Sequence, residues 1–511
     1  MGLQTLTCIV PVLMAVVLLP STSCYNYFTS TDAMEDLYDL ELFLVRYLEN
    51  YIKEEQNILS LLSGRYEQAA RSLSNIVNRE HYVANPINSF SLLRRLTQDW
   101  PKTLSLLSHN KLKDLTLPTE EDMAGAVRAL TRLQDVYSLS ATSLASGHLP
   151  GTHKTAVLCA ADCVAVAQLY YNRHDFQLAT DWLLEALGKV HHDRTCPPGL
   201  ILENLFITTC FEGDQDLSTY YLQELLEKYP LYIPPDHLVK DYNLALTGKC
   251  KEISDWKKLD KIKSVPELEQ VEIDEYHRMC RGPLPALREL QCHLVHYNHS
   301  YLRLQPFKLE ELYLEPPVVM FHDVVSDDEI AHFRKTAFSS MKRAKIVLPN
   351  GTVSAALYRT SHIAWLEDSD PVSLAVNRRI AAMTDLDVSR AETNQVSNYG
   401  LAGEYITHMD AIHGINLTHG DLDGNRLATF MIYMSDVGWG GHTVFPDLQI
   451  SVRPKKGAAL FWYNLHHDGT IDYRMRHAAC PVIVGTKWVL NKWLHEAGQE
   501  LRYRPHPVFV T

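Results

Sequence analysis

The stretch RHAACPVIVGTKWVLNKWLHE, residues 476–496, decides how the C-terminal part of this chain folds. Its β-branched and aromatic residues form short runs separated by turn residues, as in neighbouring strands of an antiparallel sheet. Similar runs precede it: VVMFHDVV at 318–325, RLATFMIYMSDV at 426–437 and GAALFWYNL at 457–465. The pattern predicts an antiparallel β domain. The sequence SDDEIAHFRKTAF, which opens at Ser326, predicts a capped helix beside the first strand.

The same stretch contains Lys487, ten residues after His477, inside the apolar run VIVGTKWVL. A lysine buried in such a strand needs an anionic partner, because an unpaired ammonium is costly to bury. The distal carboxylate of a dicarboxylic acid that chelates a metal would be a fitting partner. A lysine that points into solvent fits the same letters, so Lys487 alone leaves both interpretations open.

Upstream, His408 and Asp410 are separated by a single residue. Side chains at i and i+2 of a strand point to the same face, so these two can converge on one ion. With His477 on a facing strand they would form a 2-His-1-carboxylate triad, which leaves coordination positions open as in non-haem iron(II) oxygenases. The His-x-Asp triplet is a weak signal in a chain with 24 histidines. Combined with His477 and Lys487, it becomes specific.

Several further stretches resemble the α-subunit of the collagen prolyl 4-hydroxylases. In the C-terminal part they are YGLAGEYITHMD from Tyr399, GNRLATFMIYMSDV from Gly424, GGHTVFPD from Gly440, PKKGAALFWYNL from Pro454 and the opening stretch from Arg476. Upstream they are YRTSHIAWL, MCRGPLP, LPGTHK with AADC, and NPINSFSLLRRL. The resemblance covers nearly the whole mature chain, in the family's order.

The resemblance implies an α+β multidomain fold with an all-α N-terminal half and a C-terminal double-stranded β-helix, or jelly-roll. It implies Fe(II) at His408, Asp410 and His477, and the C5 carboxylate of 2-oxoglutarate at Lys487, with L-ascorbate as the supporting reductant. It also places further residues near the co-substrate: Tyr399, Thr429 and His495. By the same resemblance four residues approach the peptide: Tyr171, Tyr358, Arg359 and Trp365. For Thr429, Tyr358 and Trp365, ordinary packing is an equally open alternative.

The implied reaction hydroxylates prolyl residues at C4 in X-Pro-Gly sequences of procollagen, while 2-oxoglutarate is converted to succinate and CO2. The family works as an α2β2 tetramer in the lumen of the endoplasmic reticulum, with protein disulfide isomerase as the β-subunit. The helical groove departs from the family at Ile207 and Cys210, so a non-collagen, proline-rich secreted substrate stays open. A non-catalytic peptide-binding or assembly subunit is the other alternative, although the intact ligand set disfavours it.

The cysteines also follow from the resemblance. Cys280 and Cys292 match a pair that the family joins, so we expect that disulfide. The family partner of Cys480 lies near the C-terminus, but the tail LRYRPHPVFVT has no cysteine. We therefore expect Cys480 to be a free, buried thiol.

The N-terminal half divides into several predicted segments. We predict that residues 1–23 form a signal peptide, because the apolar run from Cys8 to Leu19 is too short to span a bilayer but suits the core of a signal peptide; a buried helix is the alternative. Residues 24–135 form a helical, dimerising region with a seam of Leu37, Leu44, Leu48, Tyr51, Ile58 and Leu62; a simple packed helix is the alternative. Residues 136–247 form tetratricopeptide-like helical pairs that bind peptide, 248–310 a linker and 311–511 the catalytic domain. Three sequons predict glycosylation: Asn298, Asn350 and Asn416.

Composition limits the remaining function classes. A chain of 511 residues is long enough for two to four domains, and 46% hydrophobic with 21% charged residues is globular, not disordered. The formal net charge is −13 and no long run of Lys or Arg occurs, which argues against a nucleic-acid partner. After the first residues no segment is apolar enough to predict a membrane span.

Overall fold

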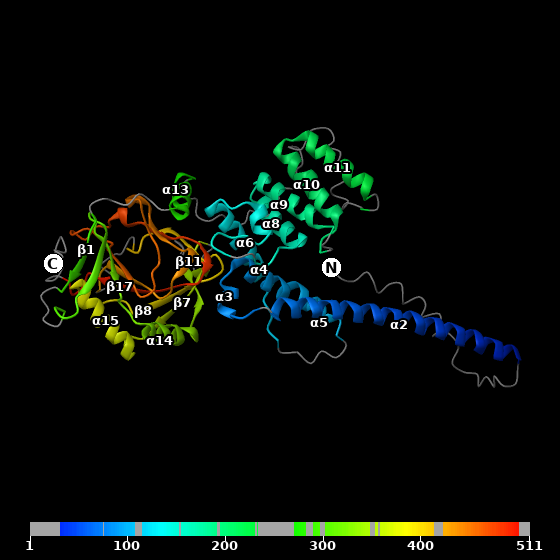
Figure 1. The fold of residues 1–511 in the computed structure, drawn as a ribbon, viewed down its shortest axis with the longest axis horizontal. Helices are drawn as coiled ribbons and strands as arrows, with labels where there is room; N and C mark the ends of the chain where they lie inside the picture. The colour runs from blue at the N-terminus through cyan, green and yellow to red at the C-terminus, as the bar shows by residue number, and fades with distance from the viewer. Residues whose placement is uncertain are drawn as a thin grey trace. The chain divides into compact units, whose positions relative to one another are not determined.

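The computed structural model describes twelve parts of the chain: residues 31–74, 76–107, 115–152, 155–191, 195–229, 232, 270–282, 290–296, 302–347, 353–355, 358–412 and 423–499. The chain divides into two compact units, one formed by residues 1–76 with 102–111 and the other by residues 77–101 with 112–511 (Figure 1). The predicted signal peptide and the three sequons lie outside the described residues. None of the described helices is long and apolar enough to cross a membrane.

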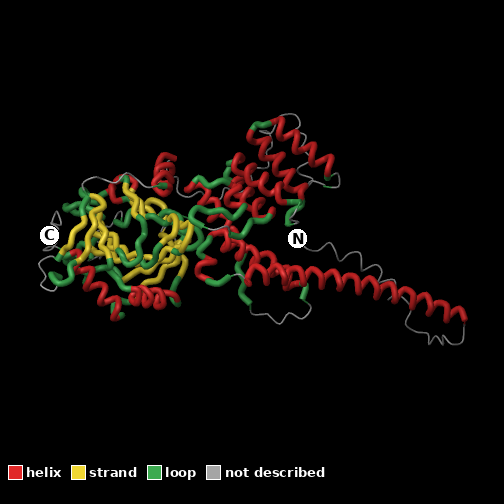
Figure 2. The backbone as a smooth tube through the Cα atoms, in the orientation of Figure 1, coloured by secondary structure: helices red, strands yellow, loops and turns green. Residues whose placement is uncertain are grey.

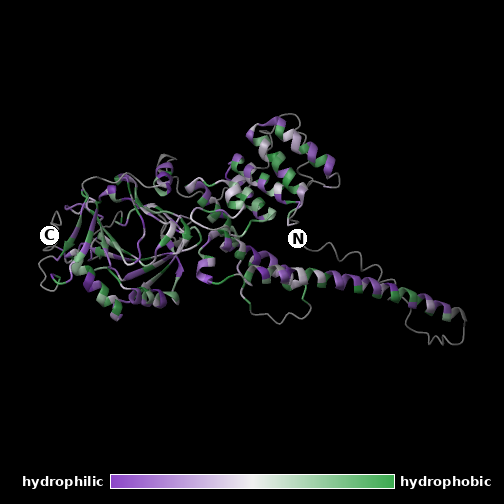
Figure 3. Ribbon diagram, viewed as in Figure 1, coloured by the Kyte–Doolittle hydropathy of each residue, from purple (hydrophilic) through white to green (hydrophobic). Residues whose placement is uncertain are grey.

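The first unit contains the long helix α2, Thr31–Ser74. The helix predicted from Thr31 to Leu62 is confirmed, and it continues for three further turns. Apolar and polar residues interleave along it (Figure 3). Three residues of the predicted seam, Leu44, Leu48 and Tyr51, are 53%, 56% and 50% exposed. The seam is therefore exposed at these three positions, while Leu37, Ile58 and Leu62 are half-buried.

The second unit begins with short helices and continues with helical pairs. Their bounds are α3 Arg79–Val83, α4 Pro86–Arg94, a π-helical stretch Arg95–Asp99, α6 Glu120–Tyr137, α7 Ala141–Ala145, α8 Ala160–Asn172, α9 Phe176–Lys189, α10 Pro198–Glu212, α11 Gln215–Lys228 and α13 Gln270–Arg281. The helix α5, Trp100–Ser105, contains residues of both units. Helical pairs predicted over 160–187 and 202–229 correspond to α8 with α9 and α10 with α11.

The turns of these pairs follow from the residues at the helix ends. Gly213 ends α10 with a φ of 90°, which a glycine adopts without strain. Asp175 and Asp214 cap the N-termini of α9 and α11, because each carboxylate accepts a hydrogen bond from the backbone N–H of the third residue of its helix. The first pair packs on α6, where the buried Gln134 accepts hydrogen bonds from Trp182 at 2.7 Å and Tyr170 at 3.0 Å.

The C-terminal part of this unit is mainly β-sheet (Figure 2). Its strands are β1 Cys292–Val295, β2 Phe307–Tyr313, β3 Val318–His322, β4 Lys342–Arg343, β5 Lys345–Val347, β6 Val353–Ala355, β7 Ser361–Leu366, β8 Asn394–Tyr399, β9 Tyr405–His408, β10 Arg426–Tyr433, β11 Val437–Gly440, β12 Thr443–Phe445, β13 Ile450–Val452, β14 Ala459–Tyr463, β15 His477–Ala479, β16 Val482–Gly485 and β17 Lys487–His495. A nine-stranded sheet has the order β1-β2-β3-β14-β10-β17-β8-β7-β4, and a four-stranded sheet has the order β13-β12-β15-β9. All pairings are antiparallel, as predicted.

Two helices cover the outer face of the large sheet: α14, Asp327–Phe338, and α15, Pro371–Thr384 (Figure 1). The predicted cap at Ser326 is confirmed, since its side chain accepts from the backbone of Glu329. The inner face packs on the small sheet, and the Tyr433 hydroxyl donates to Thr443 at 2.8 Å between them. Two facing antiparallel sheets of this kind confirm the predicted jelly-roll.

The predicted Cys280–Cys292 disulfide is wrong, and so is the expectation that Cys480 is free. Cys280 is bonded to Cys480, with 5.6 Å between their Cα atoms. The reason is the packing of α13, whose buried Tyr276, Met279 and Cys280 lie against Val444, Ala478 and Cys480 of the small sheet. Cys292 lies instead on β1, the edge strand of the large sheet, where it is exposed and free.

We expect Cys480→Ala to lower the free energy of unfolding by about 2–4 kcal/mol, because the bond closes a long loop. Cys292→Ala is the matched control and should change it by less than about 0.5 kcal/mol, as an exposed residue without a partner does. Denaturant titration without reductant measures both. A proteolytic map that joins Cys280 to Cys292 would contradict this assignment.

Candidate active site

The pairing of two short strands brings His408 and His477 together. β9 and β15 pair so that His408 lies opposite His477, with 4.3 Å between the ring centroids. Asp410 follows β9 and is buried. Its Oδ1 lies 3.9 Å from Nε2 of His408 and its Oδ2 lies 3.6 Å from Nε2 of His477. Among the described residues this is the one group of three side chains that could hold a metal ion.

Hydrogen bonds fix the direction of each ligand. Nδ1 of His408 lies 2.8 Å from the carbonyl of Ile406, and Nδ1 of His477 lies 3.0 Å from that of Met475. When Nδ1 donates to these carbonyls, each Nε2 presents its lone pair towards Asp410. The Thr429 hydroxyl donates to Oδ2 of Asp410 at 2.7 Å, which leaves Oδ1 for a metal.

Aromatic rings hold the two imidazoles in place. Tyr405 stacks on His408, with 3.5 Å between the ring centroids and 15° between the planes. The guanidinium of Arg359 lies 4.7 Å from the centroid of Tyr405. On the other side Trp462 lies 4.8 Å from His477. These contacts limit the rotation of both rings before any metal binds.

The electrostatics favour the protonation states that a metal requires. Burial lowers the pKa of His408 to about 3, and repulsion from His477 adds to the effect. Burial alone would raise the pKa of Asp410, but the charges of His477 and His408 outweigh it and bring the pKa to about 2. At neutral pH the site therefore holds a neutral imidazole and an ionised carboxylate, which are the ligand forms of these groups.

Lys487 is buried inside the same barrel, with 1% of its surface exposed. Its Nζ has no hydrogen-bond partner among the described residues and lies 5.1 Å from the ring of Tyr399 and 5.9 Å from that of Tyr433. Burial lowers its pKa to about 7. The solvent-facing alternative is excluded, and the unpaired cation fits the distal carboxylate of 2-oxoglutarate beside a 2-His-1-carboxylate iron(II) site.

The structure places the other predicted co-substrate residues around this centre. Tyr399 pairs with Lys487 in the sheet, and Thr429 contacts a ligand directly. His495 is more remote: its Nδ1 lies 2.9 Å from the carbonyl of Gly424 and its Nε2 lies 3.2 Å from Glu392. The carboxylate of Glu392 raises the pKa of His495.

The predicted substrate residues fall into two places. Arg359 lies next to Tyr405 and donates to Gln395 at 3.0 Å, and its buried Nε has no hydrogen-bond partner within the described part of the chain. Trp365 is 45% exposed and lies 5.9 Å from Trp493. The carbonyl of Tyr358 accepts a hydrogen bond from Ile406 of β9. Tyr171 lies in the helical part, 5.6 Å from Phe176 and 6.2 Å from Phe211.

The sequence did not reveal several residues around the ligands: Glu392, Tyr405, Arg426, Asn464 and Trp493. Asn464 donates to Thr429 at 3.0 Å and so supports the bond to Asp410. Arg426 pairs with Glu392, and its guanidinium lies 4.0 Å from the ring of Trp493. The orientation of Trp493 could have been inferred from that of Lys487, because residues six apart in one strand point to the same face.

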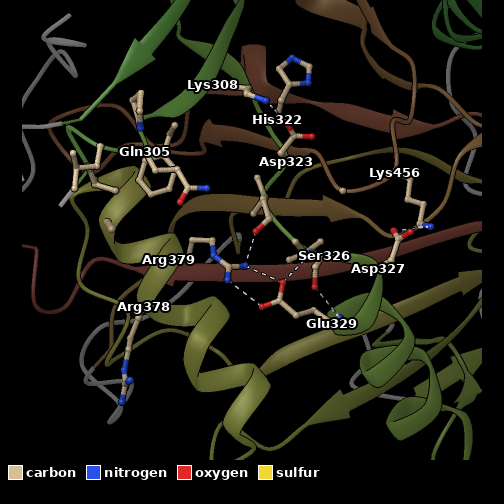
Figure 4. Close-up of a pocket in the computed structure, with 18 of the residues that line it drawn as sticks. Gln305, Lys308, His322, Asp323, Ser326, Asp327, Glu329, Arg378, Arg379 and Lys456 are labelled. Carbon is tan, nitrogen blue, oxygen red and sulfur yellow. Dashed lines mark hydrogen bonds and ion pairs between the residues drawn. The ribbon is translucent and has the colours of Figure 1, made fainter.

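The large open cavity of about 1150 Å³ beside Arg379 and Lys456 is a different feature, since none of the three metal ligands lines it (Figure 4). Three of its cations are paired: Arg379 donates to Glu329 at 3.0 Å, Lys308 to Asp323 at 2.5 Å, and Lys456 lies 2.8 Å from Asp327. Paired surface charges of this kind do not indicate a ligand.

We predict that Thr429→Val weakens Co(II) binding by about tenfold, since partners of metal ligands typically contribute 10–100-fold to affinity. The change keeps the side-chain shape but removes the donor to Asp410. Thr384→Val, on the outer helix α15, is the control and should leave the affinity unchanged. Metal titration followed by visible absorption gives both values, and equal affinity of Thr429→Val and the native chain would refute the prediction.

Comparisons with known proteins agree with this geometry. Residues 30–151 match the family model for the N-terminal region of the prolyl 4-hydroxylase alpha-subunit, and residues 394–495 match the 2OG-Fe(II) oxygenase superfamily. Rat prolyl 4-hydroxylase subunit alpha-1 is 37% identical over 533 residues, which cover 96% of this chain and 98% of the relative. Chicken prolyl 4-hydroxylase subunit alpha-2 is 36% identical over 508 residues, which cover 93% and 94%.

A solved structure of viral collagen prolyl hydroxylase from Paramecium Bursaria Chlorella virus-1, in complex with 2OG, covers 35% of this chain and 95% of its own. Its identity of 23% and TM-score of 0.28 are too low to support an inference about this chain. The rat and chicken subunits are similar enough to this chain to assign its family. Because their similarity extends over nearly the whole sequence, this chain belongs to the prolyl 4-hydroxylase α-subunit family of iron(II)- and 2-oxoglutarate-dependent oxygenases.

Proposed function

We propose that this chain hydroxylates prolyl residues at C4 in X-Pro-Gly sequences of procollagen-like chains. The observation that carries the proposal is one barrel that contains a 2-His-1-carboxylate triad and, on the facing sheet, the buried and unpaired ammonium of Lys487. Relatives named prolyl 4-hydroxylase subunits that match nearly the full length support the choice of substrate.

His408, Asp410 and His477 would hold Fe(II), and Lys487 would bind the C5 carboxylate of 2-oxoglutarate. When bound, iron and 2-oxoglutarate supply the oxidation of a C–H bond by dioxygen, with release of succinate and CO2. The residues of this chain position these groups. Thr429, supported by Asn464, keeps the Asp410 carboxylate turned towards the two histidines.

The walls of the site contribute exclusion of water. Trp462 and Phe445 cover His477, and Tyr433 and Tyr399 surround the Lys487 ammonium. A dry cavity strengthens the attraction between Lys487 and a carboxylate, because the effective dielectric constant is low. It also protects reactive groups from side reactions with solvent.

The helical pairs offer a binding surface for the peptide. Tyr171, Phe176 and Phe211 form an aromatic cluster on α8, α9 and α10, with Phe176 and Phe211 stacked at 4.9 Å. Aromatic surfaces of this kind recognise the extended polyproline II conformation of proline-rich chains. Ile207 and the disulfide-bonded Cys210 are not aromatic, which favours a non-collagen, proline-rich substrate as the second candidate.

We also propose a cellular location and a subunit assembly for this chain. The chain would act in the lumen of the endoplasmic reticulum as part of an α2β2 tetramer with protein disulfide isomerase, after removal of a signal peptide and glycosylation at its sequons. The exposed seam of α2 would supply the contact between α-subunits. L-ascorbate would restore activity after turnovers in which 2-oxoglutarate is decarboxylated but no peptide is hydroxylated.

The proposal is tested by succinate release from 2-oxoglutarate with Fe(II), ascorbate and a Pro-Pro-Gly repeat peptide, using chain co-expressed with protein disulfide isomerase. We expect peptide-stimulated release, and its loss in His408→Ala because a metal ligand is removed. His332→Ala, on the outer helix α14, should keep full activity. No stimulation by this peptide but stimulation by a proline-rich peptide without the glycine repeat would favour the second candidate; no stimulation by either would refute hydroxylation.

The affinity for 2-oxoglutarate should fall as pH rises above 7. Burial sets the Lys487 pKa at about 7, so above that pH the amine must take up a proton before it can pair with a carboxylate. Between pH 7 and pH 8 the protonated fraction falls from about one half to about one tenth, so the apparent Kd should rise about fivefold. Calorimetric titration at a series of pH values measures this dependence.

Lys487→Ala should bind 2-oxoglutarate weakly at every pH and without this slope. Lys456→Ala, which removes a surface lysine from the open cavity, should keep the native Kd and its slope. A native Kd that is constant from pH 6.5 to 8.5 would contradict the assignment of Lys487.

A further inference from the structure

A buried carboxylate joins the helical part of the second unit to the strand that carries the first metal ligand. Glu404 directly precedes β9 and is 7% exposed. Its Oε1 lies 2.5 Å from Nε of Arg132 on α6, and its Oε2 accepts a hydrogen bond from Tyr276 of α13 at 3.0 Å. We call Arg132, Tyr276 and Glu404 the Glu404 clamp. Its three members come from parts of the chain that are far apart in sequence.

The clamp holds both ligand-bearing strands. Besides Glu404, the hydroxyl of Tyr276 reaches the carbonyl of Ala479 on β15 at 3.4 Å. Arg132 also donates to the carbonyl of Ala402 at 2.9 Å, on the segment that leads into β9. Helix α13 is itself fixed to the end of β15 by the Cys280–Cys480 disulfide. α13 therefore contacts both strands from outside the barrel.

The pairing between these strands is too short to fix itself. Only two residue pairs are in register, His477 with His408 and Ala479 with Tyr405, and an irregularity separates them. β9 and β15 are not joined by a hairpin turn, which would otherwise fix their register. Contacts outside this pairing therefore help to hold β9. They include backbone bonds to Tyr358, Arg359 and Thr360 and the clamp, which makes its contacts at the Tyr405 end of the pairing.

We propose that Arg132 and Tyr276 are positioning residues that act through Glu404 to keep His408 opposite His477. This inference rests on the proposed metal site and extends it to residues in the helical part. Few residues separate Glu404 from the ligand. Glu404 directly precedes Tyr405 in the chain, and the ring of Tyr405 stacks on His408 with 3.5 Å between the centroids. A displacement of Glu404 therefore moves both the backbone and the ring that support the ligand.

The charge of Arg132 is essential to this arrangement. Burial already raises the pKa of Glu404, so without Arg132 the carboxylate, left with one neutral hydrogen-bond donor, must take up a proton or move towards water. Either change removes the ion pair that ties the start of β9 to α6. A neutral amide at position 404 would tolerate the loss of Arg132. This difference separates a positioning role from simple filling of space.

The test is Co(II) titration of the full-length chain in the complex used for succinate release, with His408→Ala as the baseline for binding elsewhere. Arg132→Met should weaken Co(II) binding by about tenfold and change its visible absorption, comparable to the loss of other ligand-supporting contacts. Adding Glu404→Gln to Arg132→Met should restore the affinity to within about threefold of the native value, since the uncompensated charge is gone.

Arg94→Met is the matched control. Arg94 lies 3.0 Å from the buried Asp162 and is as buried as Arg132, but its pair is confined to the helical part. It should lower the melting temperature and leave Co(II) affinity unchanged. Tyr276→Phe keeps the ring in its core and provides a milder variant if Arg132→Met does not fold; we expect a loss of about threefold.

If the native chain binds Co(II), the metal site stands. The inference would then be overturned by unchanged Co(II) affinity in folded Arg132→Met, or in Tyr276→Phe if Arg132→Met does not fold. Equal weakening in Arg94→Met would overturn it as well, because the effect would then follow stability. A native chain that binds no more Co(II) than His408→Ala would instead overturn the metal site itself, and with it this inference.

Discussion

The antiparallel pairing of β9 with β15 is the constraint on which the active site depends. It sets two histidines from distant parts of the sequence face to face, and the carboxylate of Asp410 then needs only a short turn after β9 to reach both. The pairing is brief, so its geometry is maintained by neighbours: stacked aromatic rings, carbonyls that accept from Nδ1, and the hydroxyl of Thr429. Each supports a ligand without being one.

The two-sheet barrel explains why a few polar groups are enough to form the binding site for the metal and 2-oxoglutarate. The large sheet supplies Thr429, Tyr399 and Lys487 from its inner face, and the small sheet supplies both histidines. Burial between the sheets lowers the pKa of both His408 and Lys487. The cost of burying Lys487 is offset when an anion pairs with it, as the distal carboxylate of 2-oxoglutarate would.

Local patterns predicted the strands, the capped helix at Ser326 and the helical pairs, because alternation, capping and turn residues are encoded within a few positions. The triplet from His408 to Asp410 and the buried Lys487 could be recognised for the same reason. Long-range packing could not. The bond from Cys280 to Cys480 depends on where α13 lies, and Glu404 gave no sign of its partner Arg132, which lies on a helix near the start of the unit. Buried ion pairs between distant segments leave no periodic trace in a sequence.

The Cys280–Cys480 bond has a topological consequence. It closes a covalent loop that spans a sequence separation of 200 residues and includes His408, Asp410 and His477. A single proteolytic cut anywhere inside this loop would leave the two pieces covalently joined, with all three ligands still tethered to the rest of the chain. An enzyme nicked in this way would run as one species on a non-reducing gel and separate into fragments only after reduction.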